Sequence, residues 1–75
     1  SLYAALETLG LRPVRGTERF RAVAARPRDA RHLRCAPGAP LLSIERRCVA
    51  ATGIPVEFTE TRYLGEAYDF TVDVR

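Results

Sequence analysis

From residue 41 onward, the sequence alternates apolar and polar residues in three segments that only turn residues separate. The segments cover residues 41–51, 55–63 and 68–75, and Thr52-Gly53-Ile54 divides the first two. Period-two alternation is typical of a strand with one buried face, and connections this short join antiparallel neighbours. The sequence therefore predicts an antiparallel meander of three strands.

The first ten residues have the pattern of a helix. Leu2, Leu6 and Leu9 recur at helical spacing and form one apolar stripe. Ser1 can cap the start of this helix, and Gly10 supplies the flexible residue that ends it.

A strand and a second helix are predicted between this first helix and the meander. Residues 17–25 alternate as a half-buried strand that Pro27 stops, and this strand must join the same sheet. Asp29 is the expected cap of a short helix over residues 30–34. The order is α-β-α-β-β-β, which predicts an α+β fold with an antiparallel sheet and helices packed on one face.

In the strand predicted over residues 41–51, the charged residue Arg46 falls on the apolar face, which is expected to be buried. An unpaired buried charge is costly, so Arg46 needs a partner. That partner could be an anionic ligand or Glu60, or the side chain could reach past the sheet edge. The residues expected to share this inward face are Leu42, Ile44, Cys48 and Ala50, and those expected to face outward are Ser43, Glu45, Arg47 and Val49.

The chain is basic but does not have the charge pattern of a nucleic-acid-binding stripe. Its 75 residues carry 12 basic residues, all arginine, and 9 acidic ones, a net charge of +3. Most arginines alternate with Glu and Asp, which is typical of a solvated surface. The exception surrounds the short helix and consists of Arg26, Arg28, Arg31 and Arg34.

Composition also excludes several classes of protein. No apolar run is long enough for a membrane span, and the start lacks the basic region of a signal peptide. Cys35, Cys48 and His32 are too few for an ordinary structural zinc site, so reduced thiols in a cytoplasmic protein without metal or cofactor are expected. No nucleophile lies beside a base and no glycine-rich phosphate loop is present, so the chain is not expected to be an enzyme.

Three motifs, in order, carry a family resemblance. They are Ser-Leu-Tyr-x-x-Leu-Glu at residues 1–7, the segment 38–57 with Gly-x-Pro-Leu-Leu-x-Ile-x-Arg and Gly-Ile-Pro-Val-Glu, and Tyr-Leu-Gly-Glu-Ala-Tyr-Asp-Phe at 63–70. Together they resemble the C-terminal half of the UTRA domain, the effector-binding domain of the HutC branch of GntR-type transcription regulators. The last motif departs from the family form, which usually has Arg, Asp and Arg at Leu64, Glu66 and Ala67.

The resemblance implies a chorismate-lyase-like fold without the lyase activity. It implies that residues 1–75 are the C-terminal part of the domain, with its N-terminal half and a winged helix-turn-helix outside this chain. Such regulators bind operator DNA through that winged helix, work as homodimers and respond to small-molecule effectors. Known effectors of the family include phosphorylated sugars, amino-sugar phosphates, histidine-pathway acids and fatty acids.

Five residues are predicted ligand contacts. Glu57 and Tyr63 are six residues apart on one strand, hence on the same face, and family members with amino-sugar ligands look similar there. The alternative is that Glu57 pairs with Arg47 across the hairpin. Arg46 is the third candidate, and Glu60 and Arg62 form either a structural pair or the rim of a pocket.

Three functions are compatible with these patterns. The first is an effector-binding and dimerising region of a transcription regulator. The second is a dimerisation module with a degenerate pocket, which the loss of arginine at Leu64 and Ala67 would suit. The third is a small enzyme of the chorismate-lyase fold.

Overall fold

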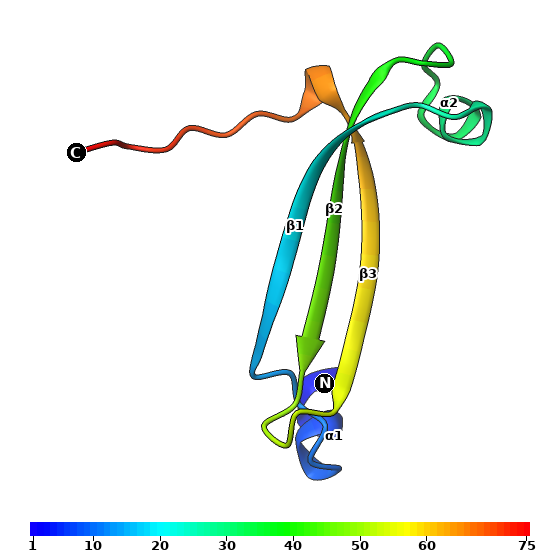
Figure 1. Ribbon diagram of the computed structural model, residues 1–75. Coiled ribbons are helices and arrows are strands. Elements are labelled where there is room, and N and C mark those ends of the chain that lie inside the picture. Colours follow the sequence, from blue (N-terminus) through cyan, green and yellow to red (C-terminus); the bar gives the residue numbers. More distant parts are fainter. The chain divides into compact units, whose positions relative to one another are not determined.

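The computed structural model describes residues 1–75 (Figure 1). Its three strands form one sheet in the order β1-β2-β3. Hydrogen bonds at both ends of the β1–β2 pair, Val14 N to Val49 O and Ala25 N to Ala39 O, show that the pair is antiparallel. The predicted α+β class is confirmed. The elements are α1 (Leu2–Thr8), β1 (Arg15–Ala24), α2 (Pro27–Leu33), β2 (Pro40–Val49), β3 (Pro55–Leu64) and the 3₁₀ helix η1 (Gly65–Ala67).

The chain divides into two compact units, and the strands run through both. The first unit contains Ser1–Arg19 and Ile44–Thr61, and the second contains Phe20–Ser43 and Arg62–Arg75. Each unit is therefore described by itself.

The first unit contains α1 and the tight turn between β2 and β3. The Ser1 hydroxyl accepts a hydrogen bond from Ala4 N at 3.2 Å, which confirms the predicted cap. Gly10 and Gly53 have φ angles of 71° and 89°, which glycine adopts without steric cost. Cys48 and Ala50 are the buried residues of this unit, whereas α1 buries none.

The second unit contains α2, which begins earlier than the sequence indicated. The helix starts at Pro27, and Arg26 occupies the N-cap position. Asp29 lies three residues into the helix, where its carboxylate accepts a hydrogen bond from Arg26 N at 3.1 Å. The prediction that Asp29 is the cap was wrong, because proline fits the first turn of a helix and its fixed φ starts one.

Burial along β2 does not follow a single face. Leu41 and Ser43 are each 2% exposed in the second unit, whereas Cys48 and Ala50 are buried in the first. Leu42 and Ile44 are only half-buried. The predictions that Leu42 points inward and Ser43 outward were wrong, because Leu41 and Ser43 are the buried residues of this strand in the second unit. In the first unit, Cys48 and Ala50 are buried as predicted.

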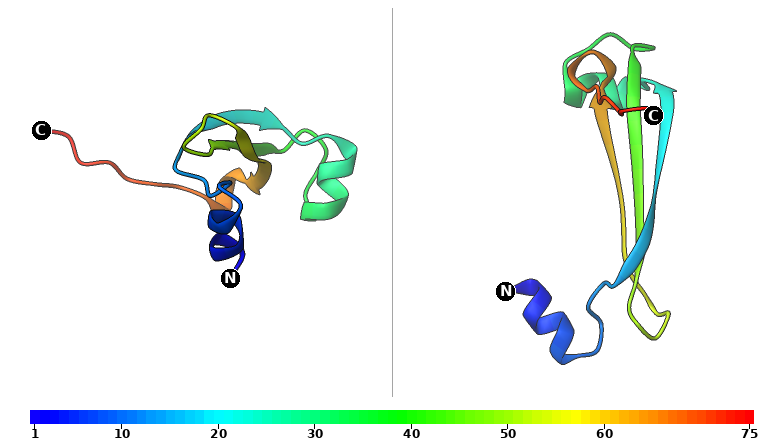
Figure 2. Two further views of the ribbon diagram at one scale, coloured as in Figure 1. Left: turned by 90° about the horizontal axis from the view of Figure 1, so that it is seen from below. Right: turned by 90° about the vertical axis from the view of Figure 1, so that its left-hand side faces the viewer.

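Residues 68–75 form no strand, although their alternation predicted one. Figure 2 draws this segment, coloured orange to red, as extended chain. Phe70, Val72 and Val74 are 67%, 70% and 93% exposed. A strand requires backbone hydrogen bonds to a neighbouring strand. The Phe70 ring packs against Phe20 of β1, with centroids 6.1 Å apart, but the segment does not join the sheet.

Large apolar side chains are mostly exposed. Leu41 is the only buried side chain larger than cysteine among the hydrophobic residues. Large exposed apolar patches are typical of interaction surfaces. Neither helix is long and apolar enough to cross a bilayer. The exposed residues are Leu2, Tyr3, Leu9, Val14, Phe20, Ile54, Phe58, Tyr63, Phe70, Val72 and Val74.

Candidate functional site

A cluster of three charged side chains spans the three strands of the first unit. Arg46 on β2 lies between Glu18 on β1 and Glu57 on β3. Its Nε is 3.2 Å from Glu57 Oε2, and its Nη1 is 3.6 Å from Glu18 Oε2. We call these three residues the cross-strand triad. With two carboxylates and one guanidinium, the triad has a net charge of −1.

The triad is half exposed. The side chains of Arg46 and Glu18 are 47% and 46% exposed, and that of Glu57 is 26% exposed. The pKa of Arg46 is raised, first by the neighbouring Cys48 and then by Glu57 and Glu18. Arg46 is therefore a permanent cation whose donors are already directed at two carboxylates.

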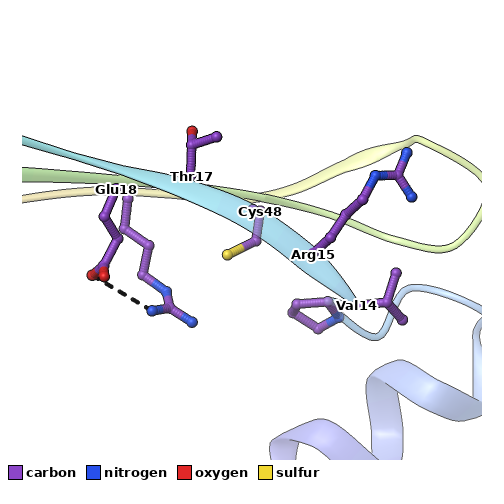
Figure 3. A pocket seen from close by; sticks show the side chains of 8 residues that line it. Val14, Arg15, Thr17, Glu18 and Cys48 are labelled. Carbon is purple, nitrogen blue, oxygen red and sulfur yellow. Dashed lines mark ion pairs between the residues drawn. The ribbon is translucent and has the colours of Figure 1, made fainter. Parts of the chain in front are cut away.

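A cavity of about 310 Å³ lies beside the triad. In Figure 3 the side chains of Glu18 and Cys48 extend to the same side of the sheet, and a dashed line marks the ion pair of Glu18. Gly16 has no side chain at this point because β1 passes close to β2: a Cβ there would lie 2.7 Å from Cys48 Sγ. The lining residues are Pro13, Val14, Arg15, Gly16, Thr17, Glu18, Arg46 and Cys48.

The structure changes the predicted pairing of Arg46 and Glu57. The expected burial of Arg46 was wrong, because its side chain is nearly half exposed. Glu57 binds Arg46 instead of Arg47, so that alternative was wrong too. Arg47 pairs with Glu45 at 3.7 Å and lies over the ring of Phe58, 4.7 Å from its centroid.

Glu18 is a member of the triad that the sequence did not reveal. Its place beside Arg46 depends on the register between β1 and β2, whose connection runs through α2. The only signal was a single glutamate among the arginines of β1, and that pattern fits a solvated strand equally well.

The remaining predicted contacts lie elsewhere. Arg62 in the second unit binds Asp29 on α2, with Nη1 2.7 Å from Oδ2 and side chains 24% and 18% exposed. Tyr63 packs on Tyr68, with ring centroids 5.0 Å apart. Glu60 is exposed on β3. Among the five predicted residues, Arg46 and Glu57 contact each other directly.

Comparison with known families fits this arrangement. The family model of the UTRA domain matches residues 1–69. The chain belongs to the UTRA domain family.

A solved structure extends the likeness of this UTRA domain to three dimensions. It is described as the ligand-binding domain of a GntR-family transcriptional regulator from Bordetella bronchiseptica. The two sequences are 34% identical, and the two structures superpose with a TM-score of 0.74. The match covers 100% of this chain and 47% of the other chain. The chain thus spans about half the length of that structure. Among curated proteins, no relative matches it.

The turn after β3 contains the motif that was expected to depart from the family form. Leu64 and Glu66 line a hollow of about 320 Å³ in the second unit, and Gly65 lies close to the Pro40 carbonyl. Leu64 stands where the resemblance implies an arginine, and the cation lining this hollow is Arg34, from the end of α2. A cation thus remains beside this turn, but a different segment supplies it.

The Asp29–Arg62 ion pair makes one pH-dependent prediction for this UTRA domain. The pKa of Asp29 is lowered from 3.8, first by the hydrogen bond from Arg26 N and then by Arg62. A carboxyl group with a depressed folded pKa stabilises the protein above its unfolded pKa and loses that effect as the pH falls through the folded value. Stability should therefore decline as the pH falls below about 3.8.

Urea unfolding at a series of acidic pH values would measure this decline. Asp29→Asn should flatten it, whereas Asp69→Asn, at an exposed position, should leave it unchanged. Equal acid sensitivity of the wild type and Asp29→Asn would show that the ion pair does not contribute.

Proposed function

We propose that this chain is the C-terminal part of the effector-binding domain of a GntR-family transcription regulator, and that it senses a small molecule without chemically changing it. One observation carries the proposal: the whole chain matches a UTRA ligand-binding domain at 34% identity. The motifs of residues 1–7 and 38–57 further support the HutC branch.

The proposal includes the rest of the regulator. Because the chain spans 47% of the matching structure and leaves many apolar side chains exposed, another half-domain would cover part of its surface. The complete cytoplasmic protein would be a homodimer that binds operator DNA through an N-terminal winged helix-turn-helix. Binding of the effector would change the relative orientation of the two winged-helix domains.

Glu57 is the proposed main contact with the effector. The cross-strand triad has a net negative charge, and Arg46 is already engaged by two carboxylates. An incoming anion would meet two carboxylates at Arg46, whereas an amine or hydroxyl could donate to Glu57 in place of Arg46, which would keep Glu18 as its partner. We therefore propose an effector with an amine or hydroxyl group at this point, as in an amino sugar. Tyr63, Arg46, Glu60 and Arg62 remain predicted contacts.

A thermal-shift screen of the full-length protein tests the function. Ligand at about 100 times its dissociation constant should stabilise the protein by about 2.7 kcal/mol. Amino sugars, sugar phosphates and carboxylic acids are the compounds to compare. A stable dimer that responds to none of them would favour the dimerisation module with a degenerate pocket.

Glu57→Gln should weaken effector binding by roughly 10- to 100-fold, because a hydrogen bond to a charged group is worth about 1.5–3 kcal/mol. The fold should persist, since Arg46 keeps Glu18 as a partner. Isothermal titration with the best compound of the screen measures the change.

Glu45→Gln is the matched control, because Glu45 is a half-buried carboxylate of the same unit that pairs with Arg47 instead. It should bind the effector like the wild type. If Glu57→Gln also binds like the wild type, Glu57 does not contact the effector.

A further inference from the structure

Helix α2 buries one face and presents arginine on the other. Asp29, Ala30 and Leu33 are buried or half-buried. Arg28 and Arg31 are exposed, as is Arg34 at the C-cap. We call Arg28, Arg31 and Arg34 the α2 arginines. Figure 1 shows α2 on the connection between β1 and β2.

The α2 arginines lack a carboxylate partner within the chain. Each of Arg12, Arg46, Arg47 and Arg62 forms an ion pair with a nearby Asp or Glu, but the α2 arginines form none. The one carboxylate of the helix, Asp29, is held by Arg62 at 2.7 Å and by Arg26 N. Like charges three residues apart on a helix repel each other, so a bound anion would relieve the repulsion between Arg28 and Arg31.

Arg34 adds a second observation, from the backbone. Its φ is 55°, and it is the only residue other than glycine with a positive φ. Glycine is the usual residue at this point of a helix end, because a side chain there has a steric cost. The chain nevertheless places an exposed arginine there, three residues after Arg31.

We propose that the α2 arginines bind the phosphate backbone of duplex DNA when the regulator occupies its operator. This inference depends on the proposed function, which brings the domain close to DNA. Guanidinium groups match phosphate oxygens in charge and geometry. The Cβ atoms of Arg28 and Arg31 are about 5–6 Å apart, and their long side chains can reach successive phosphates, which repeat every ~3.4 Å of axis along one strand.

The proposed contact between the α2 arginines and DNA is independent of base sequence. Phosphate contacts position a protein on DNA but read no sequence. The α2 arginines would therefore increase affinity equally for specific and non-specific DNA. They would also make that affinity more sensitive to salt.

The test uses a variant that should fold at least as well as the wild type. In Arg28→Gln/Arg31→Gln/Arg34→Gly, glutamine keeps helix propensity and glycine fits the positive φ of residue 34. The matched control is Arg19→Gln/Arg21→Gln/Arg75→Gln, which removes three exposed arginines that also form no ion pair. Both variants lower the net charge by the same amount.

Fluorescence anisotropy with full-length protein and a duplex several helical turns long gives the DNA affinity at a series of salt concentrations. The slope of log K against log salt should fall by about 0.9 for each lost phosphate contact, hence by about 2.7 in the α2 variant. The control should keep the wild-type slope. Equal slopes for all three proteins, or an equal loss in both variants, would overturn the proposal.

Two further outcomes are distinguishable. If the wild type binds no DNA under any condition, the proposed function fails and this inference fails with it. If a polyglutamate peptide binds the wild type as tightly as the duplex does, and the α2 variant loses both equally, the surface serves acidic proteins and the DNA assignment is wrong.

Discussion

Leu41→Ala is expected to lower the free energy of unfolding by about 3 kcal/mol, the middle of the usual range for a buried leucine. Leu41 is 2% exposed and is the only large apolar side chain buried in this chain. The other buried residues of the second unit are Ala25, Ala30 and Ser43, whose side chains are all small. Urea unfolding followed by circular dichroism measures the loss.

The neighbouring leucine is the natural control. Leu42 is half-buried, so Leu42→Ala removes less apolar contact and should cost less than half as much. The alternation of the sequence places Leu42 on the inward face, which would make Leu42→Ala the more costly change. A larger effect at Leu42 would therefore support the sequence-based register against the structure.

Gly16→Val should destabilise the protein by about 2–3 kcal/mol. Here the cause is overpacking, because there is no room for a side chain at residue 16. A Cβ at residue 16 would overlap the carbonyl oxygen of Arg47 and would lie 2.7 Å from Cys48 Sγ and 3.0 Å from Cys48 Cα. Two of these neighbours are backbone atoms that cannot rotate away. Either β1 separates from β2 at this point or the strand shifts as a whole.

Ala22→Val provides the matched control for this change. It places the same branched side chain on the same strand at an exposed position, where strands favour β-branched residues. Its unfolding free energy should stay within about 0.5 kcal/mol of the wild type. A Gly16→Val protein as stable as Ala22→Val would mean that the two strands do not approach so closely.

Local sequence patterns were sufficient to predict most helices and strands of the fold. Ser1 and Gly10 delimit α1 through interactions within a few residues, and Gly53 closes the turn between β2 and β3 in the same way. Residues 68–75 have the same kind of pattern but no strand, because a strand depends on a partner that a pattern does not supply. Patterning thus predicted which residues could form strands, and pairing decided which did.

The candidate site was predictable only in part. Glu57 and Arg46 were identified from residue type and family motif, but their contact with each other was not, because Arg46 was expected on the buried face. Glu18 could not be found at all, since its contact with Arg46 needs the register of strands joined through a helix. Register between distant strands is a property of the packed sheet, and the alternation of one strand carries no information about it.

The cross-strand triad would affect the concentration of effector that is needed for a response. Glu57 has a partner before any effector arrives, so an effector that binds Glu57 must compete with Arg46. Its apparent dissociation constant then equals the intrinsic one divided by the fraction of molecules whose Glu57 is free. Glu18 increases the fraction of molecules with a free Glu57, because Arg46 can pair with Glu18 instead. The response threshold of the regulator would then be set partly by a carboxylate that the effector need not touch.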